Sequence, residues 1–490
     1  MASISRANPT KVAADELAAR LGRWSDGDGP LYRQLATAIA ALVRAGALRD
    51  GDRLPPERSL AAVLNVSRGT VVTAYDELRA ADVVTRLQGS GTTVTAPPPA
   101  VDPATPRVGE PLIQPPAQAI ALLMAVPTAL PRVIELVRGI DWIGHADAVD
   151  QSEPAGLPRL RAAIAERIPA DGLATSPEQV VVTAGAQQAI TLATELAVRP
   201  GDVVLTEEVT WPGLVDSVRR LGGRVHGVPM DDHGLVPDEL VGAIERLRPT
   251  LIGLNPHHHN PTGTRLPPAR RERIAEIAAD YGVPVIEDRV AAPLAFDGRV
   301  PAPLAVHQPA APHFLVDSVN KTAWPGLRIG WVRTDAAVAN QLRSVRANID
   351  LYSPIPSQLA ALAVLDDLEA ITSERVAQLA ANAELVRTEL DRRIPDWDVP
   401  EVRGGLVSWI SLPVGSASAF AQVAARCGVA IGSGREFSSS TVDDEHVRIP
   451  FTAPAPELRE AIARLATAWE VFRREPAPPA VVPAERAAVV

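Results

Sequence analysis

One primary amine stands out among the side chains that could do chemistry. The chain has 490 residues and 48 lysines and arginines, of which only two, Lys11 and Lys321, are lysines. Arginine replaces lysine readily on a solvated surface but cannot form a Schiff base with an aldehyde. A lysine retained deep in such a chain is therefore a candidate for amine chemistry, and Lys321 is that residue.

Other side chains that suit one kind of cofactor follow short apolar runs of the chain. They are Gly185, Ala186, Gln187, Trp211, Asn260, Asp288, Ser318 and Arg328. A lysine can form a Schiff base, a carboxylate can keep a pyridine nitrogen protonated, and an aromatic side chain can cover a flat ring. Hydroxyl, guanidinium and helix N–H groups bind phosphate. Together these groups predict pyridoxal 5′-phosphate (PLP), although each alone also fits a structural role, such as core packing for Trp211.

Five compact apolar runs alternate with helical patterns in the same part of the chain. The runs cover residues 180–182, 203–205, 251–254, 283–286 and 314–316, and helical segments such as 270–280 separate them. This alternation is typical of an α/β fold with a mostly parallel sheet. Ligands of such sheets bind at the carboxyl ends of the strands, which is where the candidate residues fall.

The N-terminal part of the chain has the pattern of a smaller module. Its apolar spacing predicts helices over residues 31–43, 57–64 and 68–80, and short strands over 83–87 and 92–95. Ser67 is expected to be the N-cap of the third helix. This order of elements predicts a winged helix-turn-helix whose second paired helix enters the major groove of DNA.

Donors near the start of that helix and in the wing would contact the DNA. The candidates are Arg58, Ser67, Arg68, Gly69, Thr70, Gly89, Ser90 and Gly91. Arginine reaches phosphates and guanine edges, and a glycine-rich wing lets the backbone approach the minor groove. On spacing alone, Arg58 and Arg68 fit solvated surface arginines equally well.

Charge and proline content divide the chain into parts. Residues 1–96 carry 12 basic and 10 acidic side chains, whereas the remaining 394 carry 36 and 48. A slightly basic head on an acidic body favours a polyanion-binding module joined to something else. Residues 97–116 include eight prolines, which is typical of an extended linker. We expect an N-terminal extension (1–29), a DNA-binding domain (30–96), a linker (97–117), a body (118–474) and a disordered tail (475–490).

Composition excludes several classes of protein. With 46% hydrophobic and 22% charged residues, the chain has enough apolar material for packed cores. We find no run of about 18 apolar residues that would span a membrane, and no signal peptide. The single cysteine, Cys427, cannot form an internal disulfide. These features predict a cytoplasmic protein.

The N-terminal module resembles the DNA-binding domain of GntR-type bacterial regulators. The resemblance covers nearly all of residues 30–95 and rests on the segments LPPERSLA, VSRGTV and GSGTTV, in that order. It implies a bacterial protein that binds a double-stranded DNA operator and lies at the nucleoid when bound. It also implies that Arg58, Arg68, Thr70 and Gly89 to Gly91 lie at the DNA.

Residues 118–472 resemble fold type I aminotransferases, with EPAGLPRLR at 153–161 as a further landmark. The resemblance implies a smaller C-terminal subdomain and a head-to-tail homodimer. It makes Lys321 the Schiff-base lysine, Asp288 the partner of the pyridine nitrogen and Trp211 the stacking residue. Asn260 would bind the ring hydroxyl, and Arg448 the carboxylate of an amino-acid effector. The phosphate would be held by Gly185, Ala186, Gln187, Ser318 and Arg328.

A GntR-like head, a proline-rich linker and an aminotransferase-like body, in this order, resemble MocR-type transcriptional regulators. The resemblance predicts a DNA-binding regulator that binds PLP through Lys321 and senses PLP, an amino acid or an amine. No enzymatic activity is expected beyond a residual half-transamination. Two alternatives stay open: a working aminotransferase with a fused DNA-binding domain, and a regulator whose body is a cofactor-free scaffold.

The chain departs from the aminotransferase pattern near the expected cofactor. Val290 stands where a tyrosine usually bonds the ring hydroxyl, Gln151 replaces a tyrosine that reaches the partner's phosphate, and Asn320 replaces a serine. These differences weaken the prediction of turnover more than that of cofactor binding. The run 257–259 consists of three histidines but does not predict a metal site, because successive side chains of an extended strand alternate faces. A pocket or structural role is expected for it.

Overall fold

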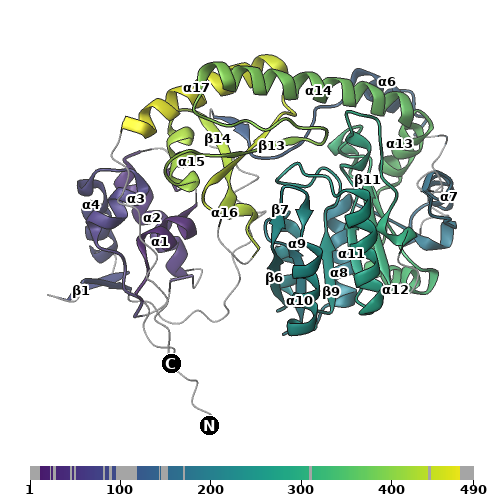
Figure 1. The fold of residues 1–490 in the computed structure, drawn as a ribbon, viewed down its shortest axis with the longest axis horizontal. Coiled ribbons are helices and arrows are strands. Elements are labelled where there is room, and N and C mark those ends of the chain that lie inside the picture. The colour runs from purple at the N-terminus through teal and green to yellow at the C-terminus, as the bar shows by residue number, and fades with distance from the viewer. Residues whose placement is uncertain are drawn as a thin grey trace, which may run out of the picture.

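A computed structural model describes most of the chain (Figure 1). The described residues are 11–22, 24–25, 29–44, 47–48, 51–80, 83–87, 91–94, 119–142, 144, 153–168, 172–307, 312–439 and 443–474. The expected linker and tail lie outside these ranges, as do Gly89, Ser90 and Gln151.

The N-terminal head contains the winged helix-turn-helix that the sequence predicts. Its elements are α1 (Ala14–Leu21), α2 (Leu31–Arg44), α3 (Glu57–Leu64), α4 (Arg68–Ala80), β1 (Val84–Leu87) and β2 (Gly91–Val94). The two strands pair antiparallel. Asn65 ends α3 with a left-handed φ of 54° and turns the chain toward α4. Ser67 caps α4 as predicted, since its hydroxyl accepts a hydrogen bond from the backbone N–H of Thr70 at 3.1 Å.

The helix α1, which lies within the expected N-terminal extension (1–29), packs with the core of this head. Val12, Leu17, Leu21 and Trp24 are buried in the same apolar cluster as the inward faces of α2, α3 and α4. Leu17 and Leu21 are four residues apart and therefore share one face of α1. That face covers apolar surface of the three-helix module that would otherwise be exposed to water.

The body is built on a seven-stranded sheet. Its strands, in spatial order, are β4 (Val180–Thr183), β12 (Gly330–Arg333), β11 (His313–Ser318), β10 (Val285–Asp288), β9 (Leu251–Leu254), β5 (Val203–Glu207) and β6 (Arg224–Val228). β12 is antiparallel to both of its neighbours, and the other neighbouring pairs are parallel. The prediction of a mostly parallel sheet is confirmed, and each of the five predicted runs overlaps one of its strands.

Helices cover both faces of this sheet (Figure 1). One face packs against α8 (Ala186–Ala197), α9 (Pro212–Arg220) and α12 (Ala336–Ala347), and the other against α10 (Pro237–Leu247) and α11 (Pro268–Asp280). Val204 and Ile286 point into the first layer, whereas their neighbours Val203 and Val285 point into the second. Because both faces are buried, the strands read as continuous apolar runs instead of alternating ones.

A second sheet forms the smaller subdomain that the resemblance implies. Its strands, in spatial order, are β13 (Val407–Ser411), β15 (His446–Pro450), β14 (Val429–Ser433) and β3 (Ile120–Leu122). It packs against α14 (Leu368–Arg393), α15 (Ala417–Arg426) and α17 (Ala455–Arg474), and α16 (Gly434–Phe437) follows β14. The core between them contains Trp397, Phe420 and Trp469, whose rings meet edge to face.

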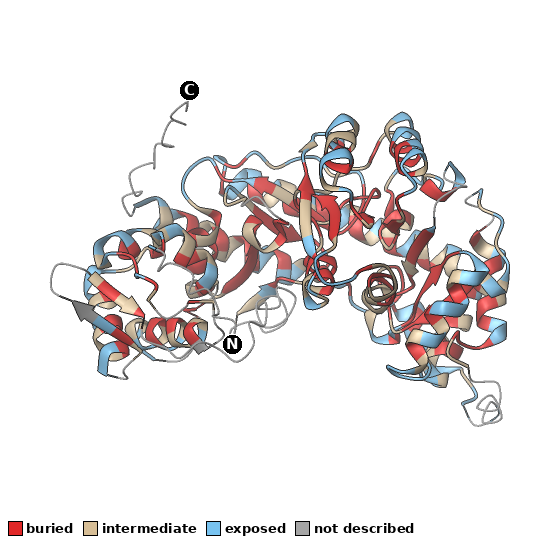
Figure 2. Ribbon diagram, turned by 90° about the horizontal axis from the view of Figure 1, so that it is seen from below, coloured by how far each residue is buried: buried red, intermediate tan, exposed pale blue. Residues whose placement is uncertain are grey.

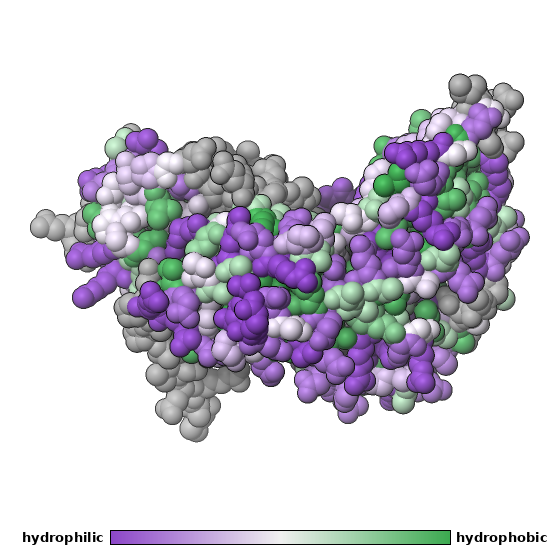
Figure 3. All heavy atoms as spheres, turned by 90° about the horizontal axis from the view of Figure 1, so that it is seen from above, coloured by the Kyte–Doolittle hydropathy of each residue, from purple (hydrophilic) through white to green (hydrophobic). Residues whose placement is uncertain are grey.

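The remaining elements complete the body around the two sheets. They are α6 (Pro131–Arg138), α7 (Pro158–Arg167), α13 (Ile355–Asp366) and the short hairpin of β7 (Met230–Asp231) and β8 (Gly234–Leu235). Buried residues fill the space between the layers (Figure 2). The face seen from above is mostly hydrophilic, with apolar side chains in scattered patches (Figure 3). No helix among the described residues is long and apolar enough to cross a membrane.

Candidate functional site

Lys321 lies just after β11, where the large sheet faces the smaller subdomain. Its side chain is partly buried, and its Nζ donates a hydrogen bond to the carbonyl oxygen of Ala125 at 2.7 Å. Burial, with the nearby Arg448 charge, lowers the pKa of Lys321 to about 8. More of its amine is therefore neutral near pH 7 than for an exposed lysine, and the neutral amine is the nucleophilic form.

Asp288 ends the neighbouring strand, β10. It is buried, and its Oδ1 accepts a hydrogen bond from the backbone N–H of Val290 at 3.1 Å. Burial raises the pKa of Asp288 to about 6, although the Lys321 charge favours its ionised form. A buried carboxylate in this position would be stabilised by a second cationic group, such as a protonated pyridine nitrogen.

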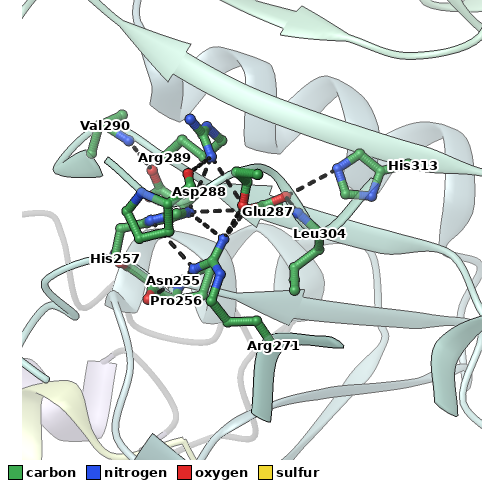
Figure 4. A network of polar contacts seen from close by, with 12 residues as sticks. Asn255, Pro256, His257, Arg271, Glu287, Asp288, Arg289, Val290, Leu304 and His313 are labelled. Atoms are coloured by element: carbon green, nitrogen blue, oxygen red, sulfur yellow. Dashed lines mark hydrogen bonds and ion pairs between the residues drawn. The ribbon is translucent and has the colours of Figure 1, made fainter. Parts of the chain in front are cut away.

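A second buried carboxylate, Glu287, lies directly behind Asp288 (Figure 4). Its Oε1 is 3.0 Å from His257 Nε2, and its Oε2 is 3.3 Å from His313 Nε2. The guanidinium groups of Arg271 and Arg289 lie 3.6 and 3.8 Å from Oε1. Burial opposes ionisation, but the hydrogen bonds from the two histidines and the Arg289 charge outweigh it and hold the pKa of Glu287 well below its usual range.

The start of α8 brings together groups that suit a phosphate. Gly185 is the N-cap, with a φ of 87°, and the first N–H groups of α8 have no partner within the helix. A Cβ at Gly185 would lie 2.8 Å from Asn320 Nδ2 and 3.4 Å from an Arg328 nitrogen, so glycine is required by space as well as by conformation. Arg328 also donates to the carbonyl oxygen of Ala184 at 2.6 Å. Helix N–H groups, a guanidinium and an amide thus converge on one point.

Two side chains that the resemblance assigns to the phosphate have partners within the protein. The hydroxyl of Ser318 donates to Ile329 O at 2.8 Å and accepts from Asn320 N at 3.0 Å. The side chain of Gln187 accepts from Trp211 Nε1 at 2.7 Å and donates to the backbone. Gln187 could therefore offer a phosphate only its backbone N–H, as Ala186 could, while its side-chain amide accepts the hydrogen bond from Trp211.

Asn320 is a functional candidate that sequence reasoning noted only as a departure from serine. Its Oδ1 accepts from Ile329 N at 3.3 Å, which directs its Nδ2 toward Gly185. The one sequence signal that could have marked Asn320 as functional is its position directly before Lys321. Its orientation depends on Ile329, the residue directly before β12, a strand that the sequence did not predict.

Asn260 and Arg448 connect the two halves of the body. Arg448, on β15, donates to Asn260 Oδ1 at 2.9 Å and also hydrogen-bonds the carbonyl oxygen of Leu123. Its guanidinium carbon lies 4.3 Å from the centre of the Phe437 ring. Arg448 is fully buried, and burial lowers its pKa to about 10.

These residues fit PLP. Lys321 and Asp288 lie at the ends of adjacent strands, and α8 begins next to Arg328 and Asn320. Trp211, at the start of α9, would lie over the ring, and Asn260 would contact its hydroxyl. Val290 has no hydroxyl to add, and Gln151 lies outside the described residues. The donor set thus includes an amine, a carboxylate, an aromatic face and an anion cradle.

The three histidines at 257–259 have structural contacts. His257 hydrogen-bonds Glu287, and His259 Nδ1 is 2.8 Å from the hydroxyl of Thr262. His258 packs against Gly404 and Gly405, where a Cβ would overlap its ring. Burial lowers the pKa of all three, so their rings are neutral at pH 7. Among the described residues, no group of three or more histidine, cysteine or acidic side chains is placed to hold a metal ion.

Most of the candidate DNA-binding residues that the structure describes are exposed on the head. Arg58, Ser67, Arg68 and Gly69 are exposed, and Thr70 is half-buried. Gly91, at the base of the wing, has a φ of 84° and a guanidinium beside it: a Cβ there would lie 2.8 Å from Arg53 Nε. Arg53 is exposed and is a further candidate for contact with DNA. The sequence did not predict it, because nothing in its local pattern marks it.

Comparison with known proteins relates both parts of the chain to families. Residues 31–94 match the bacterial regulatory proteins of the gntR family, and residues 144–465 match aminotransferase class I and II. The probable rhizopine catabolism regulatory protein MocR of Rhizobium meliloti is 31% identical over 400 residues, which cover 76% of this chain and 79% of that protein. The chain belongs to the MocR-type transcriptional regulators of the GntR family.

Some relatives of this MocR-type chain match it over nearly the full length of both proteins. The transcriptional regulator TauR of Rhodobacter capsulatus is 27% identical over 90% of this chain and 97% of its own. The body also has the fold of LysN, an alpha-aminoadipate aminotransferase from Thermus thermophilus, with a TM-score of 0.68 and 24% identity over 76% of this chain and 96% of LysN. The MocR-type chain is therefore a transcriptional regulator with an aminotransferase-like domain, and aminotransferases that are enzymes are its more distant relatives.

Proposed function

We propose that this regulator binds PLP through Lys321 and changes its affinity for operator DNA with the state of that site. PLP itself, or an amino acid or amine that reacts with it, would be the signal. The proposal is supported above all by the convergence of Lys321, Asp288, Asn260 and the α8 cradle in a chain that also carries an exposed recognition helix. A cofactor-free scaffold would not require a partly buried lysine beside a buried aspartate.

The residues of the site would divide the work of holding the cofactor. Bound PLP supplies an aldehyde that reacts with amines and a ring that withdraws electrons. Lys321 would provide the neutral amine, and Asp288 would hold the proton on the pyridine nitrogen. Trp211 would exclude water from one face of the ring. Asn260 would bond the ring hydroxyl without the tyrosine that Val290 replaces, which favours sensing over turnover.

The partners follow from the two modules. We propose a DNA-binding domain over 30–96, joined by the linker 97–117 to a body over 118–474 that forms a head-to-tail homodimer. A symmetric dimer would present two heads to two half-sites of an operator. In each head, α4 would enter the major groove, with Arg58 and Arg68 at phosphates or guanine edges. The protein would act in the cytoplasm, at the nucleoid.

We expect PLP to change the operator affinity of the wild-type protein at least about fivefold, the lower end of typical allosteric couplings. Operator fragments are first selected by the protein from random-sequence DNA. The Kd is then measured by fluorescence anisotropy at one fixed salt concentration, without PLP, with PLP, and with PLP plus single amino acids. Equal Kd values in all three conditions would contradict the proposal, and repeated turnover of an amino acid with a keto acid would favour an aminotransferase.

Two variants on α4 provide the control for specific DNA binding. Arg68→Ala should weaken operator binding about tenfold in every ligand state, because it removes a cation at the helix start. Arg79 is an exposed arginine in the last turn of α4 that pairs with Asp76 at 3.0 Å, so Arg79→Ala should leave the Kd unchanged. Equal effects of the two substitutions would argue against α4 as the recognition helix.

A further inference from the structure

An aromatic face lies beside Arg448 on the smaller subdomain. Trp409 is the cross-strand neighbour of Arg448 in the β13–β15 pair, so the two side chains point to the same side of the sheet. His446 is two residues before Arg448 and shares that side, where its ring stacks on Trp409 with centroids 5.1 Å apart. Phe437 meets Trp409 edge to face at 5.9 Å and lies under the Arg448 guanidinium.

Further apolar side chains, from segments around the seven-stranded sheet and from Met124 just after β3, line the same region. Phe437 packs with Val209, and Met124, Trp211 and Met230 extend this cluster. The backbone N–H of Thr210 donates to Phe437 O at 2.8 Å, which ties the segment before Trp211 to α16. Trp409 and the three extending side chains are only partly buried, so solvent reaches this side of the cluster.

Charges around this face are matched, with the exception of Arg448. Arg435 pairs with Asp444 at 3.3 Å, and His446 pairs with Asp443 at 2.8 Å. Arg448 forms no ion pair with a carboxylate among the described residues, although the Glu436 charge favours its ionised form, and its Nε is buried without a hydrogen-bond partner there. A buried guanidinium in this condition would be stabilised by one carboxylate. A second carboxylate on the ligand would meet aromatic rings and cations that are already paired.

We propose, on the basis of the proposed function, that the effector is a monocarboxylic amino acid with a large apolar or aromatic side chain. Its carboxylate would bind Arg448, and its side chain would lie against Trp409, whose ring is only partly buried and which the buried Phe437 holds in place. Acidic amino acids would be excluded, because their second carboxylate would be desolvated without a partner. Alanine would bind weakly, because it leaves the aromatic face in water.

The test is a titration of the PLP-loaded wild-type protein with single amino acids, followed by the visible absorbance of the cofactor. L-phenylalanine and L-leucine should bind at least about tenfold more tightly than L-alanine, and L-glutamate more weakly than L-alanine. Glutamate binding as tightly as phenylalanine, or alanine doing so, would overturn the proposal while leaving the proposed function intact. A cofactor spectrum that no amino acid or amine changes would overturn amino-compound sensing as well.

Trp409→Ala provides the matching side-chain test. It should weaken phenylalanine binding about tenfold and alanine binding little, since only the larger ligand reaches the ring. Trp142 is an exposed tryptophan on another part of the body, and Trp142→Ala should change neither the phenylalanine affinity nor the alanine affinity. Trp409→Phe retains an aromatic face and should restore most of the preference. An unchanged ratio of phenylalanine to alanine affinity in Trp409→Ala would overturn the assignment of this face.

A second, independent observation concerns the contact between head and body. In the ribbon view the head lies beside α15 of the smaller subdomain (Figure 1), and both α1 and α3 contact this helix. Gln422 on α15 is buried and makes two hydrogen bonds to the head: its Oε1 accepts from Trp24 Nε1 at 2.9 Å, and its Nε2 donates to Gly22 O at 3.3 Å. Arg426, one turn further, donates to the carbonyl oxygen of Asn65 at 3.5 Å.

This contact reaches the turn that sets the recognition helix. Asn65 is the left-handed residue between α3 and α4, so a shift of α15 would be felt where the two DNA-binding helices join. The other end of α15 is fixed by Asp444, which accepts hydrogen bonds from the hydroxyl of Ser416 at 2.5 Å and the N–H of Ser418 at 2.9 Å. Asp444 lies two residues before β15, the strand that carries Arg448.

We infer that α15 is the element that couples the effector site to the DNA-binding head, through Gln422 and Arg426. The inference rests on the proposed function and locates the coupling in a packed contact instead of in the linker. A ligand that draws Arg448 and β15 would move Asp444 and therefore the start of α15. Because α15 would move as one rigid helix of ten residues, a shift at its start would also move Gln422 and Arg426, and with them the head.

Gln422→Ala should remove this coupling. In wild-type protein the operator Kd should differ at least about fivefold between PLP-free and PLP-loaded states, and in Gln422→Ala the ratio should fall close to one. The variant should retain the visible absorbance of bound PLP and specific binding to the operator. Gln341 is an exposed glutamine on α12, and Gln341→Ala should keep the wild-type ratio.

Trp24→Phe tests the same contact if Gln422→Ala does not fold, because it removes the indole donor and keeps an aromatic ring in the head core. A wild-type ratio in both variants would overturn the role of α15 and leave the proposed function standing. A ratio of one in the wild-type protein would instead overturn the proposed function itself.

Discussion

Lys321→Arg should abolish the covalent attachment of PLP to this protein. The substitution keeps a positive charge near Asp288 and roughly the same length, but a guanidinium does not form a Schiff base. The measurement is borohydride reduction of the PLP-loaded protein, followed by peptide mass spectrometry. Wild-type protein should carry one pyridoxyl group on the peptide that contains Lys321, and Lys321→Arg should carry none.

The composition of the chain supplies an unusually direct control. Lys11 is the second of its two lysines, and its side chain is exposed. Lys11→Arg should therefore label as the wild-type protein does. A Lys321→Arg protein that is still labelled at wild-type level, on Lys11 or on the N-terminal amine, would contradict the assignment of Lys321.

The rate of attachment should also depend on pH in a defined direction. Attack requires the neutral amine, so the rate should rise with pH and level off above the pKa of Lys321, which burial lowers to about 8 from the ordinary 10.5. A stopped-flow record of the visible absorbance between pH 6 and pH 10 would measure this profile. A rate that continues to rise toward pH 10 would show an amine with an ordinary pKa.

The places of the candidate cofactor residues in the fold could be predicted from sequence because the signals are local. Each buried strand is a short apolar run, and Asp288 and Ser318 are the polar residues at which two of these runs end. In a parallel sheet, the carboxyl ends of neighbouring strands meet at one edge. Local reading of the strands was therefore sufficient to bring Asp288 and Lys321 together.

Features that depend on distant pairing could not be predicted in the same way. The smaller sheet joins β3 to β14, which lies some three hundred residues later in the chain, and no local pattern marks that pairing. β12 lies antiparallel between two strands, and Ile329, the residue directly before it, orients Asn320. Side-chain direction was equally hidden: Ser318 and Gln187 have hydroxyl and amide groups suited to phosphate, but both are bonded within the protein.

Glu287, the carboxylate next to Asp288, shows most clearly what a local sequence pattern cannot predict. The predicted strand covers residues 283–286, and the sequence assigns the next residue, Glu287, no role. Its partners come from α11, from the loop after β9, from β11 and from the residue after Asp288 (Figure 4). These four partners are at least 14 residues from one another in sequence, so only the fold brings them to a single carboxylate.

Glu287→Ala should destabilise the body by about 3–5 kcal/mol, the usual cost of removing one partner from a buried ion network. Both Arg271 and Arg289 are almost completely buried, and they would lose their carboxylate. Leu304 N, which donates to Glu287 Oε2 at 2.8 Å, would lose its acceptor as well. The measurement is urea-induced unfolding at pH 7, followed by near-ultraviolet circular dichroism, whose signal includes the tryptophans of the body.

Matched substitutions separate charge from packing. Glu276 is exposed and pairs with Arg273 at 3.2 Å on the surface of α11, so Glu276→Ala should cost at most about 1 kcal/mol. Glu287→Gln retains the size of the side chain and a hydrogen-bond acceptor but removes the charge. Its loss of unfolding free energy should lie between those of Glu276→Ala and Glu287→Ala. Equal stabilities of Glu287→Ala and Glu276→Ala would refute the view that this network supports the floor of the site.

The stability difference between wild-type protein and Glu287→Ala should also depend on pH, in a defined direction. The pKa of Glu287 is held well below that of an unfolded glutamate, near 4.5, so its ionised form stabilises the folded state fully above that pH. The contribution is lost as the pH falls through the folded-state pKa. The stability gap between wild-type protein and Glu287→Ala should therefore be widest near pH 7 and should narrow below pH 4.5, whereas a gap caused by lost packing alone would not change with pH.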